Sequence, residues 1–347
     1  MTPKPLRPPI IELVAVRTKE FLRETEALFW VFGFPLLLAL ALGFAFRAKP
    51  PDRIPIGIAA GPHAQQRAAA LAKSPVLLAR IMPADEGALA LRRGKISLLV
   101  EGDDAPLYRF DPTRPDSRAA RIEADDALQT AAGRRNVFGA HEEHITQQGS
   151  RYIDFLMPGL VGMNLMSTGM WGMGFAIVNA RMRKLLKRLV ATPMRKSQYI
   201  LSFFLSRMIW LVLEVVLLVA FGWLVFGVRV NGSLALLTLL CIVGGYAFSG
   251  LGLMIASRVK TIEAVSGMMN LIMVPMWICS GVFFSYERFP DAVKPYIRLL
   301  PLTALNDALR AVINDAAGIG QVAMPLVILA AWGIIGFAVG IRIFKWQ

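Results

Sequence analysis

Six long runs of apolar residues constrain this chain more than any other feature of its sequence. A helix needs about 20 predominantly apolar residues to cross the hydrocarbon core of a bilayer. The 347-residue chain contains six runs near or above that length, at 28–46, 155–180, 200–228, 234–256, 264–284 and 324–344. They predict a mainly α-helical membrane protein with six transmembrane helices.

The composition agrees with a membrane protein. Hydrophobic residues make up 55% of the chain and charged residues 18%, whereas soluble domains average about 45–50% and about 25%. The two cysteines, Cys241 and Cys279, both lie inside apolar runs. They form neither a metal-ligand spacing nor a disulfide framework, so we expect no metal site from them.

The distribution of Lys and Arg predicts the orientation. The short segments 1–27, 179–199, 257–263 and the C-terminus are rich in these residues and fall on one side of six spans. Short cytoplasmic loops carry such an excess. We therefore expect both termini in the cytoplasm and the long segment 47–153 outside, because long loops cross largely regardless of charge.

Segment 47–153 is long enough to form a domain between the first two spans. Short apolar runs at 54–60, 95–101 and 106–110 predict strands, and 64–74 and 114–138 predict helices. The alternation predicts a small extracytoplasmic α/β domain. The Gly-Lys pair within 92–97 lacks the remaining residues of a phosphate-binding loop. His141 and His144 are three apart rather than four, so we expect solvated histidines there rather than a zinc site.

Two further segments are amphipathic. Residues 1–27 predict a helix that either lies on the inner membrane face or packs on a partner element. Within 154–347, which holds the other five spans, segment 285–318 is too polar to cross the bilayer. Pro290, Pro295 and Pro301 divide it into short helices that we expect to lie at the outer interface or to dip into it.

Arg207 and Glu214 interrupt the third apolar run, where charges are costly. Their positions differ by about 10 Å along one face of a helix, so the spacing predicts no direct pair. We expect Arg207 to extend toward the nearer membrane surface. Two alternatives remain for Glu214: a hydrogen bond to a neighbouring helix, or a contact with a substrate or subunit.

The stretch 181–196 contains seven basic residues and no acid, between two apolar runs. Its composition alone fits a nucleic-acid patch, a helix on the membrane surface or a contact site for a partner protein.

Three stretches together carry a family resemblance. "RKLLKRLVATPMRKSQYIL" (183–201), "SGVFFSYERFPDAVKPYIRLLPLTALNDALR" (280–310) and "FDPTRPDSRAAR" (110–121) resemble segments of permease subunits of the ABC-2 family of ABC exporters. The resemblance is to members with a large extracytoplasmic domain after the first span, and it extends over the whole chain.

The resemblance implies that ATP is hydrolysed by a partner and not by this chain. It implies a homodimer or heterodimer of permeases with two separate ATP-binding subunits, which bind ATP and Mg. No cofactor, catalytic residue or metal site is then expected on this chain, and it is not an enzyme. The implied function is export of an amphipathic or hydrophobic substrate, such as a drug, lipid or glycolipid, across the bacterial cytoplasmic (inner) membrane.

The resemblance also gives residues 181–193 a role, as a cytoplasmic coupling helix. Leu185, Leu186 and Leu189 form an apolar ridge that would fit a groove on an ATP-binding subunit. Four basic residues flank this ridge: Arg183, Lys184, Lys187 and Arg188. Pro193 follows it. The ridge favours a protein partner, with membrane lipid as a second contact and no nucleic acid.

Two other classes of function stay open. One is a membrane-anchored receptor or assembly scaffold that uses segment 47–153 as a binding module. The other is an intramembrane enzyme, for which Arg207 and Glu214 are the only strong candidates.

Overall fold

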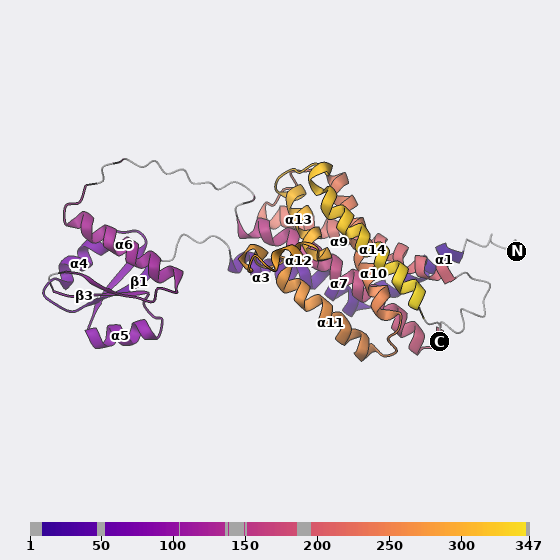
Figure 1. Ribbon diagram of the computed structural model, residues 1–347, viewed down its shortest axis with the longest axis horizontal. Helices are drawn as coiled ribbons and strands as arrows, with labels where there is room; N and C mark the ends of the chain where they lie inside the picture. The colour runs from indigo at the N-terminus through magenta and orange to yellow at the C-terminus, as the bar shows by residue number, and fades with distance from the viewer. Residues whose placement is uncertain are drawn as a thin grey trace. The chain divides into compact units, whose positions relative to one another are not determined.

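The computed structural model describes residues 9–46, 53–103, 105–135, 138, 149, 151–185 and 196–344. The chain divides into two compact units (Figure 1). The smaller unit comprises Ala48–His144, and the larger comprises Met1–Arg47 together with Ile145–Gln347. The smaller unit is therefore an insertion between the first apolar helix and the next long one.

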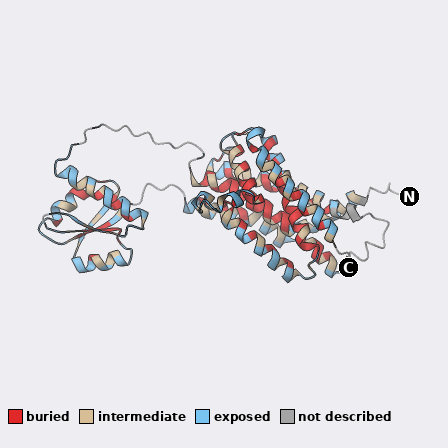
Figure 2. Ribbon diagram, in the orientation of Figure 1, coloured by how far each residue is buried: buried red, intermediate tan, exposed pale blue. Residues whose placement is uncertain are grey.

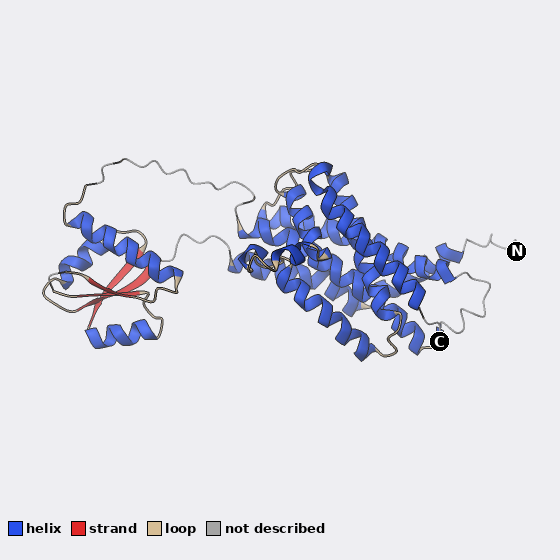
Figure 3. Ribbon diagram, viewed as in Figure 1, coloured by secondary structure: helices blue, strands red, loops and turns tan. Residues whose placement is uncertain are grey.

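The described residues of the smaller unit form a four-stranded sheet in the order β2-β1-β3-β4 (Figure 3). Strands β1 (Ile54–Ala59), β2 (Leu77–Met82) and β3 (Leu98–Glu101) are parallel, and β4 (Leu107–Arg109) is antiparallel to β3. Parallel neighbours need a crossover connection, usually a helix. Helices α4 (Ala64–Leu71) and α5 (Ala84–Arg92) supply the two crossovers.

Helices cover both faces of this sheet, which confirms the predicted α/β region. Ile56, Ile58, Leu98 and Val100 are fully buried in one core with α4 and α6 (Pro115–Ala131). On the other face α5 packs so closely that a Cβ on Gly87 would lie 2.6 Å from Leu99 Cδ1.

Five helices among the described residues are long and apolar enough to cross a membrane. The first, Thr25–Ala45, contains α2 (Thr25–Leu28), the π-helical turn η1 (Phe29–Gly33) and α3 (Phe34–Ala45). The second is Leu201–Phe226 within α9 (Lys196–Phe226). The remaining three are α10 (Leu234–Ala256), α11 (Ile262–Cys279) and α14 (Ile319–Ile343).

The other predicted span corresponds to α7 (Tyr152–Met182), a helix of 31 residues. Most of its residues are buried (Figure 2), and it packs against α9, α10, α11 and α13. A helix enclosed by other helices can keep small and polar side chains because little of it faces lipid. The Gly- and Met-rich sequence of α7 therefore agrees with its position inside the unit.

Glycines allow the helices of this unit to approach closely, as small residues do in membrane proteins. A Cβ on Gly252 of α10 would lie 2.6 Å from the carbonyl oxygen of Met170 on α7. A Cβ on Gly336 of α14 would lie 2.6 Å from the carbonyl carbon of Gly250 on α10. These backbone contacts leave no room for a side chain.

The N-terminal helix α1 (Pro9–Arg23) packs along α9. The Arg17 guanidinium lies 3.7 Å from the centre of the Phe203 ring, and the Phe21 and Trp210 rings are 4.6 Å apart. The amphipathic arm thus contacts a helix of its own chain, while its place relative to the membrane face stays a prediction.

Segment 285–318 contains short helices, as its prolines indicate: η2 (Tyr286–Arg288), α12 (Lys294–Arg298) and α13 (Pro301–Ile313). Pro301 begins α13, a position that suits its fixed φ and missing N–H. Most of α13 is buried against α7, α10 and α14. This helix is therefore part of the helical core rather than a surface helix.

We expect Gly162→Ala to destabilise the contact between α7 and α13. Its Cβ would lie 2.0 Å from Oδ1 of Asn306, whose side chain is buried and bonded to the Ser280 carbonyl. Overpacking of this kind costs about 1–3 kcal/mol, so thermal unfolding in detergent should begin at a lower temperature. Gly267→Ala is the control, because nothing lies within 4 Å of its Cβ position on α11. Equal midpoints for the two variants would contradict the expectation.

Candidate functional site

In the described part of the helical unit, three groups of polar side chains connect α7 to a neighbouring helix. We call them the Glu214 cluster, between α7 and α9; the Arg181 joint, at the C-terminal end of α7; and the α13 network, between α13 and the start of α7.

The Glu214 cluster is a buried ion pair with two polar neighbours. The Glu214 side chain is 1% exposed, and Arg207 Nη2 lies 2.6 Å from its Oε2. Asn164 Nδ2 and Thr168 Oγ1 on α7 donate to the same oxygen at 3.3 and 3.2 Å. The carboxylate therefore links α9 to α7 through hydrogen bonds on both helices.

The expectation that Arg207 and Glu214 are too far apart to pair is wrong, as is the expectation that Arg207 extends toward the membrane surface. The spacing of seven positions puts Arg207 and Glu214 on one face of α9, two turns apart. Their side chains are long enough to meet across these two turns. Pairing is favoured because either charge alone would be costly in this buried position. Of the two alternatives for Glu214, the structure shows the hydrogen bond to a neighbouring helix.

The Arg181 joint fastens the last turn of α7 to the end of α10. Arg181 Nη1 donates to the carbonyls of Ala256, at 2.9 Å, and Val259, and Nη2 donates to the Ser257 carbonyl at 3.0 Å. Carbonyls at a helix C-terminus lack intrahelical donors and carry partial negative charge, so they favour a cation.

The same joint reaches α14. Ser257 Oγ lies 2.8 Å from the carbonyl oxygen of Gly340, and the Arg181 guanidinium carbon lies 5.5 Å from the centre of the Phe344 ring. The C-terminal ends of α7, α10 and α14 therefore meet at this one arginine. In the sequence Arg181 is only one of several basic residues, and nothing nearby marks its role, because its partners lie about 75 positions away.

The segment predicted to be the coupling helix, 181–193, begins at this joint. Arg181 and Met182 complete α7 rather than starting a separate helix. Lys184, with φ of 55°, adopts the left-handed conformation common at helix ends. Arg183, Lys184 and Leu185 are exposed. The other predicted coupling residues lie outside the described residues: Leu186, Lys187, Arg188, Leu189 and Pro193.

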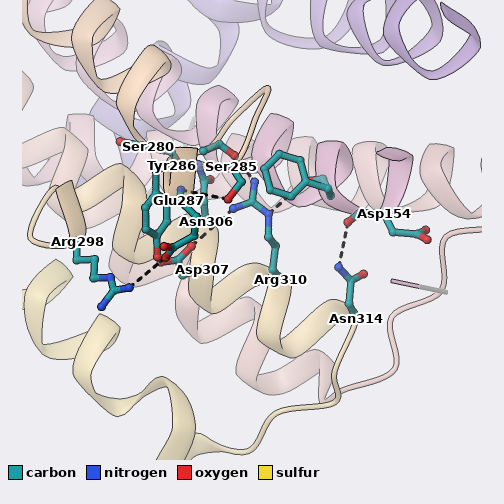
Figure 4. Close-up of polar contacts among 12 residues, drawn as sticks. Asp154, Ser280, Ser285, Tyr286, Glu287, Arg298, Asn306, Asp307, Arg310 and Asn314 are labelled. Atoms are coloured by element: carbon teal, nitrogen blue, oxygen red, sulfur yellow. Dashed lines mark hydrogen bonds and ion pairs between the residues drawn. The ribbon is translucent and has the colours of Figure 1, made fainter. Parts of the chain in front are cut away.

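The α13 network is built around Arg310 (Figure 4). Its guanidinium lies 3.8 Å from the centre of the Phe155 ring, and it donates to the carbonyls of Phe155, at 3.3 Å, and Gly281. Burial lowers the pKa of Arg310 to about 10. Asp307 lies 3.7 Å from this guanidinium and accepts from the Tyr286 hydroxyl at 2.9 Å. Burial also raises the pKa of Asp307.

Two asparagines of the same segment complete the network (Figure 4). Asn306 donates to the Ser280 carbonyl at 2.9 Å, and Asn314 donates to the Asp154 carbonyl at 3.0 Å. The network thus holds α13 and the turn after α11 against the first turns of α7. Its side chains bond mainly to backbone, which points to a structural role.

The geometry does not favour chemistry at these places. Arg207 and Glu214, the candidates for an intramembrane enzyme, are engaged with each other. Among the described residues, no group of three or more His, Cys, Asp and Glu side chains is arranged to hold a metal ion. His141 and His144 lie outside the described residues.

The helical unit with its inserted α/β region is that of a multi-pass membrane protein. The chain matches the family described as "ABC-2 family transporter protein" over residues 26–342. It therefore belongs to the ABC-2 family, and the resemblance predicted from its sequence is confirmed. The chain is a permease subunit of an ABC-2 type transporter.

Two curated relatives are similar over about half of this chain. "ABC transporter G family member 20" of Dictyostelium discoideum is 26% identical over 187 residues, or 53% of this chain and 25% of that protein. "Linearmycin resistance permease protein LnrN" of Bacillus subtilis (strain 168) is 26% identical over 180 residues, or 51% and 46%. The matches thus span less than half the length of either relative.

We expect the charges of the Glu214 cluster to be strongly coupled. Leaving one charge buried without its partner costs about 3–5 kcal/mol, so Arg207→Leu and Glu214→Ala should each lower the unfolding temperature markedly. The unfolding temperature of the double variant should fall by less than the sum of the two single-variant decreases, because no charge remains unpaired. Glu214→Gln should be milder than Glu214→Ala, since its amide oxygen can still accept from Asn164 and Thr168. A double-mutant cycle by thermal unfolding measures this, and additive losses would rule out the coupling.

Proposed function

We propose that this chain is the permease subunit of an ATP-driven exporter. The substrate would be amphipathic or hydrophobic, such as a drug, lipid or glycolipid, and would leave the cytoplasm or the inner membrane. Membership of the ABC-2 family supports transport driven by a partner. A relative named for linearmycin resistance supports the outward direction, because removal of a toxic compound confers resistance.

ATP hydrolysis would take place on separate subunits. The sequence has no complete phosphate-binding loop, which phosphoryl transfer in ATPases of this kind requires. Two ATP-binding subunits would therefore hold ATP and Mg, beneath a homodimer or heterodimer of permeases. Membrane lipid would surround the spans.

The observation that carries this proposal is the position of the coupling stretch. Residues 181–193 start at the Arg181 joint, where the ends of α7, α10 and α14 are bonded together. A displacement of this stretch by an ATP-binding subunit would act on three helices at once. The exposed Leu185 side chain is the first of the three leucines that would contact the subunit.

The same joint supports the proposed orientation. The ends of α7, α10 and α14 meet there, and each carries or precedes basic residues, including Arg183, Arg258 and Arg342. Because short cytoplasmic segments are rich in Lys and Arg, we place this end in the cytoplasm. The termini would then be cytoplasmic and the α/β unit extracytoplasmic, in a bacterial inner membrane.

The leucine ridge should matter more to the ATPase contact than any single charge. Burial of one Leu contributes about 1.5–3 kcal/mol, while an exposed ion pair contributes less than about 1 kcal/mol. Leu186→Asp should therefore remove the ATP-binding subunits during co-purification or abolish the ATPase activity of the complex. Lys187→Ala is the matched control and should retain both. A Leu186→Asp complex with intact subunits and normal activity would rule out the coupling role.

Thiol labelling tests the orientation independently. In a chain with Cys241 and Cys279 replaced by Ala, Ala119→Cys reports on the exposed face of α6 and Lys184→Cys on the coupling stretch. An impermeant reagent applied to intact spheroplasts should label position 119 and reach position 184 only after lysis. The reverse pattern would overturn the proposed orientation.

A further inference from the structure

An apolar groove of about 810 Å³ lies between α1 and α9. One face of each helix lines it, including Ile11, Val14 and Thr18 on α1 and Leu205, Ile209 and Val212 on α9. These positions follow the three- and four-residue spacing of a single helix face. Ile209 is 54% and Val212 47% exposed, so the described part of the chain leaves the groove open.

The groove has apolar walls and one charged lining residue. The Thr18 hydroxyl donates to the Val14 carbonyl at 2.9 Å, so its hydrogen bond is made within α1. Lys19 is the charged residue of the lining, and in the described part of the chain no carboxylate is paired with it. The nearby Arg17 differs, since it pairs with Glu20 at 3.1 Å and lies over the Phe203 ring.

The position of the groove relates it to one leaflet of the membrane. Helix α1 ends at Arg23, just before the first span begins at Thr25. The groove residues of α9 lie in the first half of the span Leu201–Phe226. The groove is therefore near the side on which both spans begin. The exposed residues Arg183 and Lys184 follow the end of α7 and come shortly before α9 in the chain.

We propose that the groove binds an anionic phospholipid, with an acyl chain along the apolar walls and the phosphate paired with Lys19. A lysine at a membrane surface attracts anionic lipid, and the other basic residues at this end of the unit add to that attraction. This inference requires only that the chain spans a membrane and does not depend on export.

Native mass spectrometry of the purified permease tests the site with two probes, phosphatidylglycerol and phosphatidylcholine of identical acyl chains. Lys19→Gln should weaken phosphatidylglycerol binding about fivefold, the effect of one lysine at a membrane surface, and leave phosphatidylcholine binding unchanged. Ile209→Trp should weaken both, because the indole would fill the groove.

Matched controls come from the same two helices. Arg23→Gln removes a charge from α1, and Val216→Trp adds an indole to an exposed position of α9; neither residue lines the groove. Arg23→Gln should weaken phosphatidylglycerol binding less than Lys19→Gln does, because Arg23 does not line the groove, and Val216→Trp should bind both lipids as the wild type does. Equal effects of Lys19→Gln and Arg23→Gln, or unchanged binding by Ile209→Trp, would overturn the proposal. So would a disulfide between two copies formed through Ile209→Cys in native membranes, which would show a permease dimer contact there instead.

Discussion

The enclosure of α7 by other helices is the constraint on which the rest of the helical unit depends. Small residues make this enclosure possible: a Cβ on Gly169 would lie 2.9 Å from Phe248 Cβ, and Gly162 admits the Asn306 amide. In lipid, apolar burial gives helices little reason to associate, so close packing and interhelical hydrogen bonds must hold them. Helix α7 supplies both.

All three polar sites have one partner on α7. Its first turns bond to α13, its middle bonds to Glu214 on α9, and its last turn bonds to α10 through Arg181. Under the proposed function, this helix connects the inserted α/β unit at one end with the coupling stretch at the other. A closely packed helix suits that task, because a displacement at one end is not absorbed by loose packing along its length.

Much of the fold could be predicted from the sequence because many of its elements produce a recognisable local pattern of apolar residues. Apolar runs predict membrane helices, since a backbone in lipid must satisfy its own hydrogen bonds. Strands β1 and β3 are recognisable because both are central and buried. Strand β2 and helix α5 were missed: β2 is an edge strand with Arg80 in its middle, and Gly87 interrupts α5. Their stability comes from contacts with β1 and Leu99, which a local pattern does not report.

The sequence by itself determined the apolar helices, the inserted α/β region, the basic stretch after α7 and the membership of a transporter family. Only the tertiary structure decided which polar residues act together. The Glu214 carboxylate meets Asn164 from 50 positions earlier, and Arg181 meets carbonyls 75 positions later. Hydropathy and spacing describe one helix at a time, whereas hydrogen bonds between helices depend on which faces meet. Packing determines which helix faces meet. At α7 this depends on the glycines that allow two backbones to come into contact.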